Sequence, residues 1–407
     1  MQNKNTLNYL KLQKLFSVIL LFISVFYLGY YLGVSGIDIR IGLKPVSVAV
    51  NNKIPTKKID FQKFWNAWDA TTKGKDTATV SKIYYTSILG MVQSLGDPYT
   101  SFLTPDVNKS FGDALGGKYE GIGAELGLKD NKLIIVAPLD GSPAKAAGVR
   151  SGDLIIKIDG VSTTGISVSD AVVKIKGPAG TNVTLTLQTG SEIPRDVTIT
   201  RSVISVPSVT WEDKGNGIVY IRISRFGTET NKEWDNAVIE INNKMKELNS
   251  IIIDVRGNPG GYLESAVHVS EEFFTGKPVV YEENATGEQI PLVAKRIGSF
   301  DKIPAVFVLV DEGSASASEI LAAALRDNFG AKLIGTKTFG KGTIQDAKDF
   351  SDGSGLHITI AKWLTPKKQW INKVGLQPDV QVSITEGDIT ADKDPQLDKA
   401  IELAKKI

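Results

Sequence analysis

Cysteine is absent from the 407-residue sequence, and histidine occurs only twice, as His268 and His357. Without thiols the chain has no cysteine nucleophile, no disulfide and no thiolate metal ligand, and its redox compartment stays undetermined. Two histidines supply too few imidazoles for a histidine-based metal centre. We therefore expect no metal site and no cofactor.

An excess of charge of one sign is also lacking. The 47 basic and 45 acidic residues are spread along the chain and leave a formal net charge of +2. No large basic face is indicated, so we expect no nucleic-acid partner. With 42% hydrophobic and 23% charged residues, the chain is long enough for two or three globular domains and is not of a disordered or fibrous class.

Long uncharged runs are missing except at one place, the twenty residues from Leu15 to Val34. At about 1.5 Å per helical residue this run spans about 30 Å, the thickness of the hydrocarbon core of a bilayer. A cleaved signal peptide is the alternative, since Gly33-Val34-Ser35 could be a cleavage site, but the run is longer than a usual signal core. We predict an uncleaved transmembrane anchor.

The charges that flank this run favour one orientation. Three lysines (Lys4, Lys11 and Lys14) precede the run, and Arg40 and Lys44 follow it. This small positive-inside bias predicts a single-pass protein of the cell membrane with a cytoplasmic N-terminus and an extracytoplasmic body, either periplasmic or extracellular.

The remaining chain changes its pattern several times. Helical spacing of apolar residues from Phe61 gives way at about residue 117 to short β-branched strands, and after Val206 apolar strands alternate with amphipathic helices. The sequence therefore divides into a cytoplasmic N-terminus (1–14), a transmembrane anchor (15–34), a linker (35–57), an N-terminal helical region (58–116), a β-rich domain (117–204), an α/β core (205–382) and a C-terminal helical tail (383–407).

The alternation in the core predicts a buried, largely parallel α/β sheet. In such sheets the functional groups lie on loops at the carboxyl ends of strands. Three loops qualify, namely 256–261, 311–318 and 336–342.

Ser316 lies in the second of these loops, where a strand ends and a helix begins. Its hydroxyl would stand at the positive end of a helix dipole, beside backbone N–H groups that could hold an oxyanion. The structural alternative is equally plain, because Ser316 and Glu319 form the S-x-x-E pattern of a capping box.

Lys341 lies in the third loop, in a glycine-rich segment after the next strand. It could serve as a base only when neutral, which requires a lowered pKa. Gly335-x4-Gly340-Lys341 also begins a phosphate-binding P-loop, which would make the chain a nucleotide-binding enzyme. That motif needs Ser or Thr after the lysine, and here Gly342 follows.

The first loop, Gly257-Asn258-Pro259-Gly260-Gly261, has no hydroxyl but could present backbone N–H groups to an oxyanion. Its structural alternative is a left-handed turn. Ser142-Pro-Ala-Lys145 matches the S-x-x-K pattern of penicillin-recognising enzymes, without the partner triplets of that class.

Six motifs together resemble the C-terminal processing peptidases, or tail-specific proteases, which are PDZ-containing Ser/Lys serine proteases. The resemblance covers residues from about 60 to 382. The motifs are GMVQSLGDPYTSFLTP (90–105), YEGIGAELG (119–127), SPAKAAGVRSGDLIIKIDG (142–160), DVRGNPGGYL (254–263), GSASASEILAAAL (313–325) and GTKTFGKGTIQ (335–345).

The resemblance implies a crotonase-like α/β protease core with an inserted PDZ domain, and it implies roles for particular residues. Ser316 would be the nucleophile, Lys341 the general base, and Gln345 the residue that orients the base. The oxyanion hole would come from the backbone of Ala317 and of Gly260 or Gly261.

The β-rich domain would be the family's PDZ domain. Its carboxylate-binding loop would be Gly121-Ile122-Gly123-Ala124, where successive N–H groups form a nest for the C-terminal carboxylate of a substrate that adds as a strand. The expected partners are protein or peptide substrates with accessible C-terminal tails, the membrane through the N-terminal helix, and a homo-oligomeric copy or adaptor protein. Asp97 to Thr100 would have a structural or gating role.

The chain departs from the family pattern at two places. Asp311 stands where the family often has asparagine, and Thr365-Pro366-Lys367-Lys368-Gln369-Trp370 replaces the TP-x-G-R segment. Neither change touches Ser316 or Lys341. We therefore predict a serine endopeptidase acting on extracytoplasmic protein tails, with a catalytically silent PDZ scaffold as the alternative.

Overall fold

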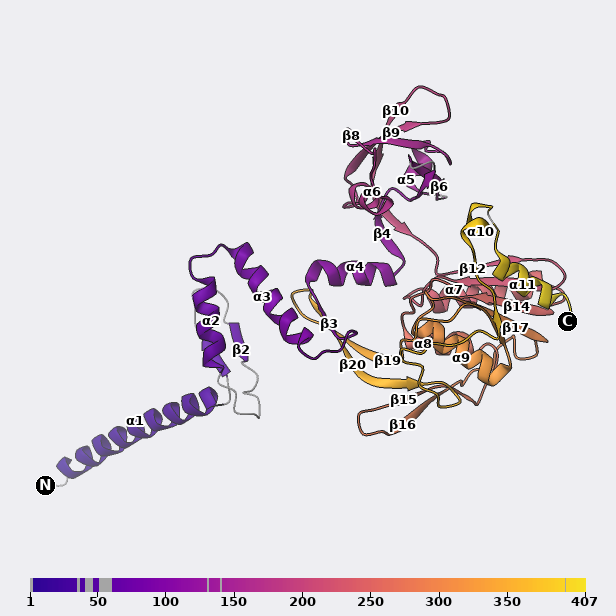
Figure 1. Cartoon of the computed structure of the whole chain (residues 1–407). Coiled ribbons are helices and arrows are strands. Elements are labelled where there is room, and N and C mark those ends of the chain that lie inside the picture. The colour runs from indigo at the N-terminus through magenta and orange to yellow at the C-terminus, as the bar shows by residue number, and fades with distance from the viewer. Residues whose placement is uncertain are drawn as a thin grey trace. The chain divides into compact units, whose positions relative to one another are not determined.

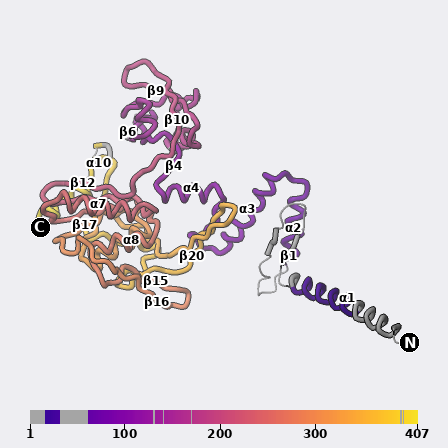
Figure 2. Tube along the Cα trace, turned by 180° about the vertical axis from the view of Figure 1, so that it is seen from behind, coloured from indigo at the N-terminus to yellow at the C-terminus, as the bar shows by residue number. Residues whose placement is uncertain are grey.

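The computed structural model describes residues 3–34, 37–40, 47–50, 61–129, 132–139, 141–391 and 393–407, which form two compact units, 1–83 and 84–407. The first unit contains α1 (Asn3–Val34), β1 (Ile37–Arg40), β2 (Ser47–Val50), α2 (Gln62–Thr72) and the start of α3 (Thr77–Gln93) (Figures 1 and 2). None of the helices in the described ranges combines the length and apolarity that crossing a membrane requires. Most of the predicted linker 35–57 lies outside the described residues.

A small antiparallel sheet forms the β-rich domain, with strand order β10-β9-β7-β6-β5. Along β9, Val183, Leu185 and Leu187 are buried and alternate with more exposed residues, as expected for a strand with one face on a core. The elements are β4 (Lys118–Gly121), β5 (Ala124–Lys129), β6 (Lys132–Pro138), α5 (Pro143–Ala146), β7 (Leu154–Ile158), β8 (Val161–Ser162), α6 (Val168–Ile175), β9 (Asn182–Gln188), β10 (Arg195–Thr200) and β11 (Ser202–Ser205).

Two features of this domain bear on binding. Strand β5 is an edge of the sheet, so its outer backbone groups are free of a neighbouring strand of that sheet. Strands β4 and β11 pair with each other outside the sheet and lead into and out of the domain.

The core of the second unit is a six-stranded sheet with order β12-β13-β14-β17-β18-β21. The pairs from β13 to β21 are parallel, and only the edge pair β12–β13 is antiparallel. The predicted largely parallel sheet is therefore confirmed, whereas the crotonase-like description stays a prediction. The strands are β12 (Val209–Asp213), β13 (Ile218–Ile223), β14 (Ser250–Asp254), β17 (Ala305–Val310), β18 (Lys332–Gly335) and β21 (Val380–Gln381).

Helices cover both faces of this sheet, which explains why β14 is buried along its length and apolar from Ile251 to Ile253. Ile251 and Ile253 pack into a core shared with α7 (Thr230–Lys244), α8 (Leu263–Ser270) and α9 (Ala317–Phe329). Ile252 points to the opposite core, shared with α11 (Pro395–Ala404). A central parallel strand buried on both faces needs such an uninterrupted run.

A second, antiparallel sheet has the order β16-β15-β20-β19, and β3 pairs with the first residues of β20, from Gly355 to His357. This pairing brings the start of the unit beside a strand more than 250 residues later in the chain. The elements are β3 (Ser101–Leu103), β15 (Pro278–Glu283), β16 (Gln289–Val293), β19 (Thr343–Asp349) and β20 (Gly355–Leu364), with α4 (Pro105–Leu115) and α10 (Glu386–Thr390) as the remaining helices.

Trp234 on α7 is fully buried, with its ring centroid 6.2 Å from Phe273 and 6.4 Å from Phe300. We expect Trp234→Ala to lower the free energy of unfolding by about 3–5 kcal/mol, because it removes a large side chain from a packed core. Ile239→Ala on the same helix is the control, since Ile239 is 57% exposed and should cost less than about 1 kcal/mol. Equal losses in denaturant titrations would contradict this placement of the core.

Candidate active site

Ser316 occupies a tight turn between β17 and α9. Its backbone has φ 55° and ψ −116°, a conformation that non-glycine residues adopt only under constraint, at a cost on the order of 1–3 kcal/mol. The constraint comes from the neighbouring loop, where the Asn258 carbonyl accepts from Ala315 N–H at 3.0 Å and from Ser318 Oγ at 2.9 Å. The predicted capping box is present, and Ser316 N–H donates to Glu319 Oε2 at 3.0 Å.

Lys341 lies in the loop between β18 and β19, and two tryptophans hold its main chain. Trp363 Nε1 donates to the Lys341 carbonyl at 2.7 Å, and Trp370 Nε1 donates to the Gly342 carbonyl at 2.9 Å. Trp370 belongs to the segment in which the chain departs from the family pattern, so this segment supports the lysine loop.

The side chain of Lys341 is part-buried and donates from Nζ to Gln345 Oε1 at 2.9 Å. Burial lowers the pKa of Lys341, because a desolvated ammonium is disfavoured, and the charge of Asp97 opposes that effect. A lysine with a lowered pKa is closer to the neutral form that a general base needs.

A buried carboxylate joins the serine loop to the lysine loop. Glu319 is 0% exposed, and its Oε2 accepts from Ser316 N–H at 3.0 Å and from Lys341 N–H at 2.9 Å. Its Oε1 accepts from Thr338 Oγ1 at 2.5 Å and from Gly340 N–H at 2.8 Å. Burial raises the pKa of Glu319, and these four hydrogen bonds oppose the rise.

Ser316 and Lys341 thus belong to one cluster, although they share no direct hydrogen bond among the described residues. Their backbone N–H groups meet at the same carboxylate oxygen of Glu319. The sequence pattern S-x-x-E signalled Glu319 only as a helix cap, and its link to the lysine loop depends on the tertiary fold.

The loop after β14 lies directly against the serine loop. A Cβ at Gly260 (φ +100°) would stand 2.8 Å from the Ser316 Cβ and 3.0 Å from the Ala317 nitrogen, so only glycine allows this approach. The Gly260 N–H donates to Asn258 Oδ1 at 2.9 Å. The Gly261 N–H donates to no acceptor among the described residues, so it is the available one of the two.

Asp311, the first departure from the family pattern, also joins these two loops. Its Oδ1 accepts from Gly257 N–H at 2.7 Å and from Gly313 N–H at 3.0 Å. The carboxylate is therefore engaged by the backbone of both loops.

The C-terminal helix α11 is tied to the loop after β14 as well. Arg256, at the start of that loop, forms ion pairs of 2.7 Å with both Asp254 and Asp394. Asp394 caps α11 by accepting from Leu397 N–H at 3.0 Å. The sequence predicted a helical tail but gave no sign of this contact.

The predicted carboxylate-binding loop lies at the junction of β4 and β5 in the β-rich domain. Gly121 ends β4, Ile122 is buried, and Gly123 has φ +72°, with a Cβ there placed 2.4 Å from the Ser142 Cβ. Ala124 begins β5, the edge strand. These residues are therefore grouped beside a free edge of the β-rich domain.

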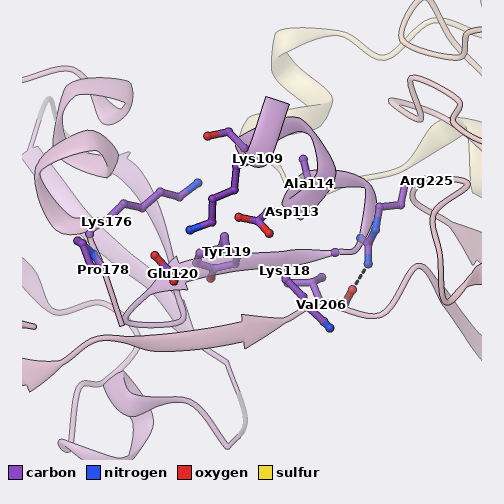
Figure 3. A pocket seen from close by; sticks show the side chains of 13 residues that line it. Lys109, Asp113, Ala114, Lys118, Tyr119, Glu120, Lys176, Pro178, Val206 and Arg225 are labelled. Atoms are coloured by element: carbon purple, nitrogen blue, oxygen red, sulfur yellow. Dashed lines mark hydrogen bonds between the residues drawn. The ribbon is translucent and has the colours of Figure 1, made fainter. Parts of the chain in front are cut away.

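A separate cavity of about 530 Å³ lies beside β4 and α4 (Figure 3). Lys176 stands over the Tyr119 ring at 4.9 Å from its centroid, and Arg225 donates to the Val206 carbonyl. None of the predicted site residues is among the described residues that line it.

Comparison with known proteins agrees with this architecture. Residues 217–382 match the model of peptidase family S41, and residues 134–189 match that of the PDZ domain. A solved structure of a Bacteroides fragilis NCTC 9343 protein assigned to the S41 proteases has a TM-score of 0.58 at 16% identity, covering 77% of this chain and 87% of that one. At that identity the likeness shows the fold alone.

Two curated relatives are more similar in sequence. The carboxy-terminal processing protease CtpA of Bacillus subtilis (strain 168) is 40% identical over 299 residues, which cover 73% of this chain and 63% of the relative. A protein of Staphylococcus aureus (strain COL) named for its likeness to the serine protease CtpA is 40% identical over 311 residues, covering 76% and 61%. The chain thus spans less than two thirds of their length.

These matches define a class of protein in which a peptidase region is combined with a PDZ domain. The chain contains an S41 peptidase region at residues 217–382 and a PDZ domain at residues 134–189.

Glu319→Gln tests the link between the two loops. The amide nitrogen that replaces one carboxylate oxygen cannot accept hydrogen bonds, so backbone or hydroxyl donors lose their partner. We expect the free energy of unfolding to fall by about 1–3 kcal/mol and cleavage of an unfolded protein to fall at least about tenfold.

Glu312→Gln is the matched control for Glu319→Gln, because Glu312 lies exposed in the same loop. It should leave both quantities near those of the unaltered chain. Unchanged stability and cleavage in Glu319→Gln would show that the carboxylate does not hold the site.

Proposed function

We propose that the chain is a serine endopeptidase that cleaves C-terminal tails of proteins through an acyl-enzyme on Ser316, with Lys341 as general base. The observation that carries the proposal is the cluster around Glu319, which fixes a strained serine and a lysine of lowered pKa to one buried carboxylate. The S41 match and the CtpA relatives support the same reaction class.

In this mechanism neutral Lys341 removes the proton from Ser316 Oγ as that oxygen attacks the scissile carbonyl carbon. The resulting ammonium then donates a proton to the departing amine, which leaves an ester between Ser316 and the substrate. Water attacks this ester, with Lys341 again taking the proton, and the acid product and free serine are released. The direct Ser316–Lys341 contact would form with substrate, since catalytic hydrogen bonds often tighten only in the complex.

Gln345 would orient the base. Its Oε1 accepts one Nζ hydrogen of Lys341 at 2.9 Å, and its Nε2 donates to the Tyr99 carbonyl. An amide held at both ends restricts the rotation of the amine, so that the lone pair of neutral Lys341 can be directed away from Gln345 and towards the serine.

The oxyanion of the tetrahedral intermediate would be bound by backbone N–H groups of Ala317 and Gly261. Ala317 is the first residue of α9, where a helix leaves its N–H groups without partners inside the helix. Gly261 is preferred to Gly260 because the Gly260 N–H is already bonded to Asn258.

Substrate tails would be captured by the PDZ domain. A tail could add as a strand to the free edge of β5, with its terminal carboxylate at the nest formed by Gly121, Ile122, Gly123 and Ala124. A membrane anchor at 15–34, an extracytoplasmic body and an adaptor or homo-oligomeric partner stay predictions from the sequence, and the catalytic proposal does not depend on them.

A catalytically silent PDZ scaffold is the second candidate. It accounts for the PDZ domain but not for a buried carboxylate that gathers the backbone of both Ser316 and Lys341. The two candidates differ in one measurable respect, which is peptide-bond cleavage by the full chain.

Ser316→Ala and Lys341→Ala test the mechanism. Each should reduce kcat/KM on an unfolded protein with an apolar C-terminal tail by at least about a thousandfold, because each removes a group that reacts directly. Circular dichroism and binding of the tail should stay unchanged. The control Lys337→Ala removes an exposed lysine from the same loop. Full activity in either site variant would disprove the Ser/Lys mechanism.

The pH dependence gives an independent test. The base must be neutral, so kcat/KM should rise with pH through the pKa of Lys341. Burial lowers that pKa from 10.5, so the midpoint of the rise should lie below that value. The measurement is a pH profile of kcat/KM on a substrate without ionisable groups near the cut. A profile that falls over the same range would contradict the assignment of Lys341 as base.

A further inference from the structure

The turn from Asp97 to Thr100 leads into β3 and stands beside the strand that carries Gln345. Thr359 N–H on β20 donates to Thr100 Oγ1 at 3.1 Å, and Thr359 is the register partner of Gln345 on β19. The pairing of β3 with β20 continues this attachment, with Ser101 opposite His357. The turn is therefore fixed to the same sheet as the residue that holds Lys341.

Tyr99 touches the base in two ways. Its carbonyl accepts the hydrogen bond from Gln345 Nε2, whose Oε1 in turn accepts from Lys341 Nζ. Its ring faces the lysine, with Nζ 5.4 Å from the ring centroid, a cation–π distance that favours the ammonium form. The ring acts directly on the nitrogen that takes up the proton, and the carbonyl acts on it through Gln345.

Asp97 adds a charge to the same turn. Its Oδ2 accepts from Thr100 Oγ1 at 2.6 Å, and its Oδ1 accepts from Tyr99 N–H at 3.1 Å. Burial acts to raise the pKa of Asp97, but these hydrogen bonds together hold it below its ordinary value, so the group is an anion at neutral pH. Among the described residues Asp97 forms no ion pair, and its charge acts on Lys341.

We propose that Asp97 and Tyr99 are positioning residues for the general base, holding Gln345 through the Tyr99 carbonyl and stabilising the ammonium of Lys341 after it has taken the serine proton. This inference rests on the Ser/Lys mechanism proposed above. It replaces the purely structural or gating role that the sequence suggested for the turn.

The physical need arises from the site itself. Lys341 is part-buried, so the ammonium that forms during attack loses solvation that water would give. Burial alone would keep the amine neutral, but it would also lower its basicity, so that the amine would accept the serine proton poorly. The aromatic face beside Nζ and the anion on the same turn restore part of the lost stabilisation and keep the amine basic enough to remove the serine proton.

The other titratable groups that act near the lysine in the described part of the chain are not equivalent to Asp97. Glu319 binds the Lys341 main-chain N–H, not Nζ. His357 on β20 has its pKa lowered by burial and, in smaller part, by the charge of Lys341, and Asp349 acts on that histidine in the opposite sense. A protonated His357 would repel the ammonium of Lys341. The pH profile of kcat/KM should therefore be interpreted only at pH values above the pKa of His357, where the imidazole is neutral.

The test is the pH profile of kcat/KM for Asp97→Asn and Tyr99→Leu in the full chain, with folding checked by circular dichroism. Both variants remove stabilisation of the ammonium and so lower the pKa of Lys341. The rising limb should therefore move to lower pH, by about half a pH unit or more for Asp97→Asn. Tyr99→Phe keeps the ring and should move the limb less than Tyr99→Leu.

Asp213→Asn is the matched control. Asp213 also accepts from the backbone N–H two residues on, Gly215, at 2.7 Å, but it lies at the end of β12 on the edge of the other sheet. The rising limb of kcat/KM for Asp213→Asn should coincide with that of the unaltered chain. If Asp97→Asn still cleaves and its rising limb has the same midpoint pH as that of the unaltered chain, the proposal is wrong. If Asp97→Asn does not fold, Tyr99→Leu decides by the same criterion.

The outcome is separable from that of the mechanism. If Lys341→Ala abolishes cleavage and the limb of Asp97→Asn does not move, the base is correct and the role of the turn is wrong. If Lys341→Ala cleaves normally, the mechanism itself has failed.

Discussion

The arrangement of the site depends on the hydrogen bonds that the buried carboxylate of Glu319 accepts. A fully buried carboxylate is costly unless its oxygens are satisfied, and here four donors do so. Two of those donors are the backbone N–H groups of Ser316 and Lys341. The need to satisfy one buried carboxyl group therefore brings together two loops that follow different strands.

The parallel sheet makes that meeting possible. Strands β14, β17 and β18 are neighbours, so the loops at their carboxyl ends emerge at one edge. Close contact then depends on glycine, because a Cβ at Gly260 would collide with the serine turn. The strained backbone of Ser316 is maintained by hydrogen bonds to Asn258 on the neighbouring loop, and Arg256 connects that loop to the C-terminal helix.

The lysine is handled by a different part of the fold. The second sheet carries Gln345 on β19 and brings the Asp97 turn to it through β20. One sheet thus places Ser316, the proposed nucleophile. The other sheet places the groups that surround the amine of Lys341, the proposed base, and the loop of Lys341 joins the two sheets. This division explains how Glu319 can bind the backbone of Lys341 while Tyr99 and Gln345 contact its amine.

The sequence by itself determined the class of the core, the PDZ domain and the loops that carry the candidate residues, since periodicity, glycine turns and motif spacing are local properties. Ser316 and Lys341 could be named because their loops follow neighbouring strands. Tertiary structure alone decided that Glu319 binds both loops, that Gly261 and not Gly260 has an available N–H, and that Tyr99 faces the Lys341 amine. Those facts arise from contacts between residues far apart in the chain. Such contacts are set by the pairing of the strands and by the donors that packing leaves without a partner.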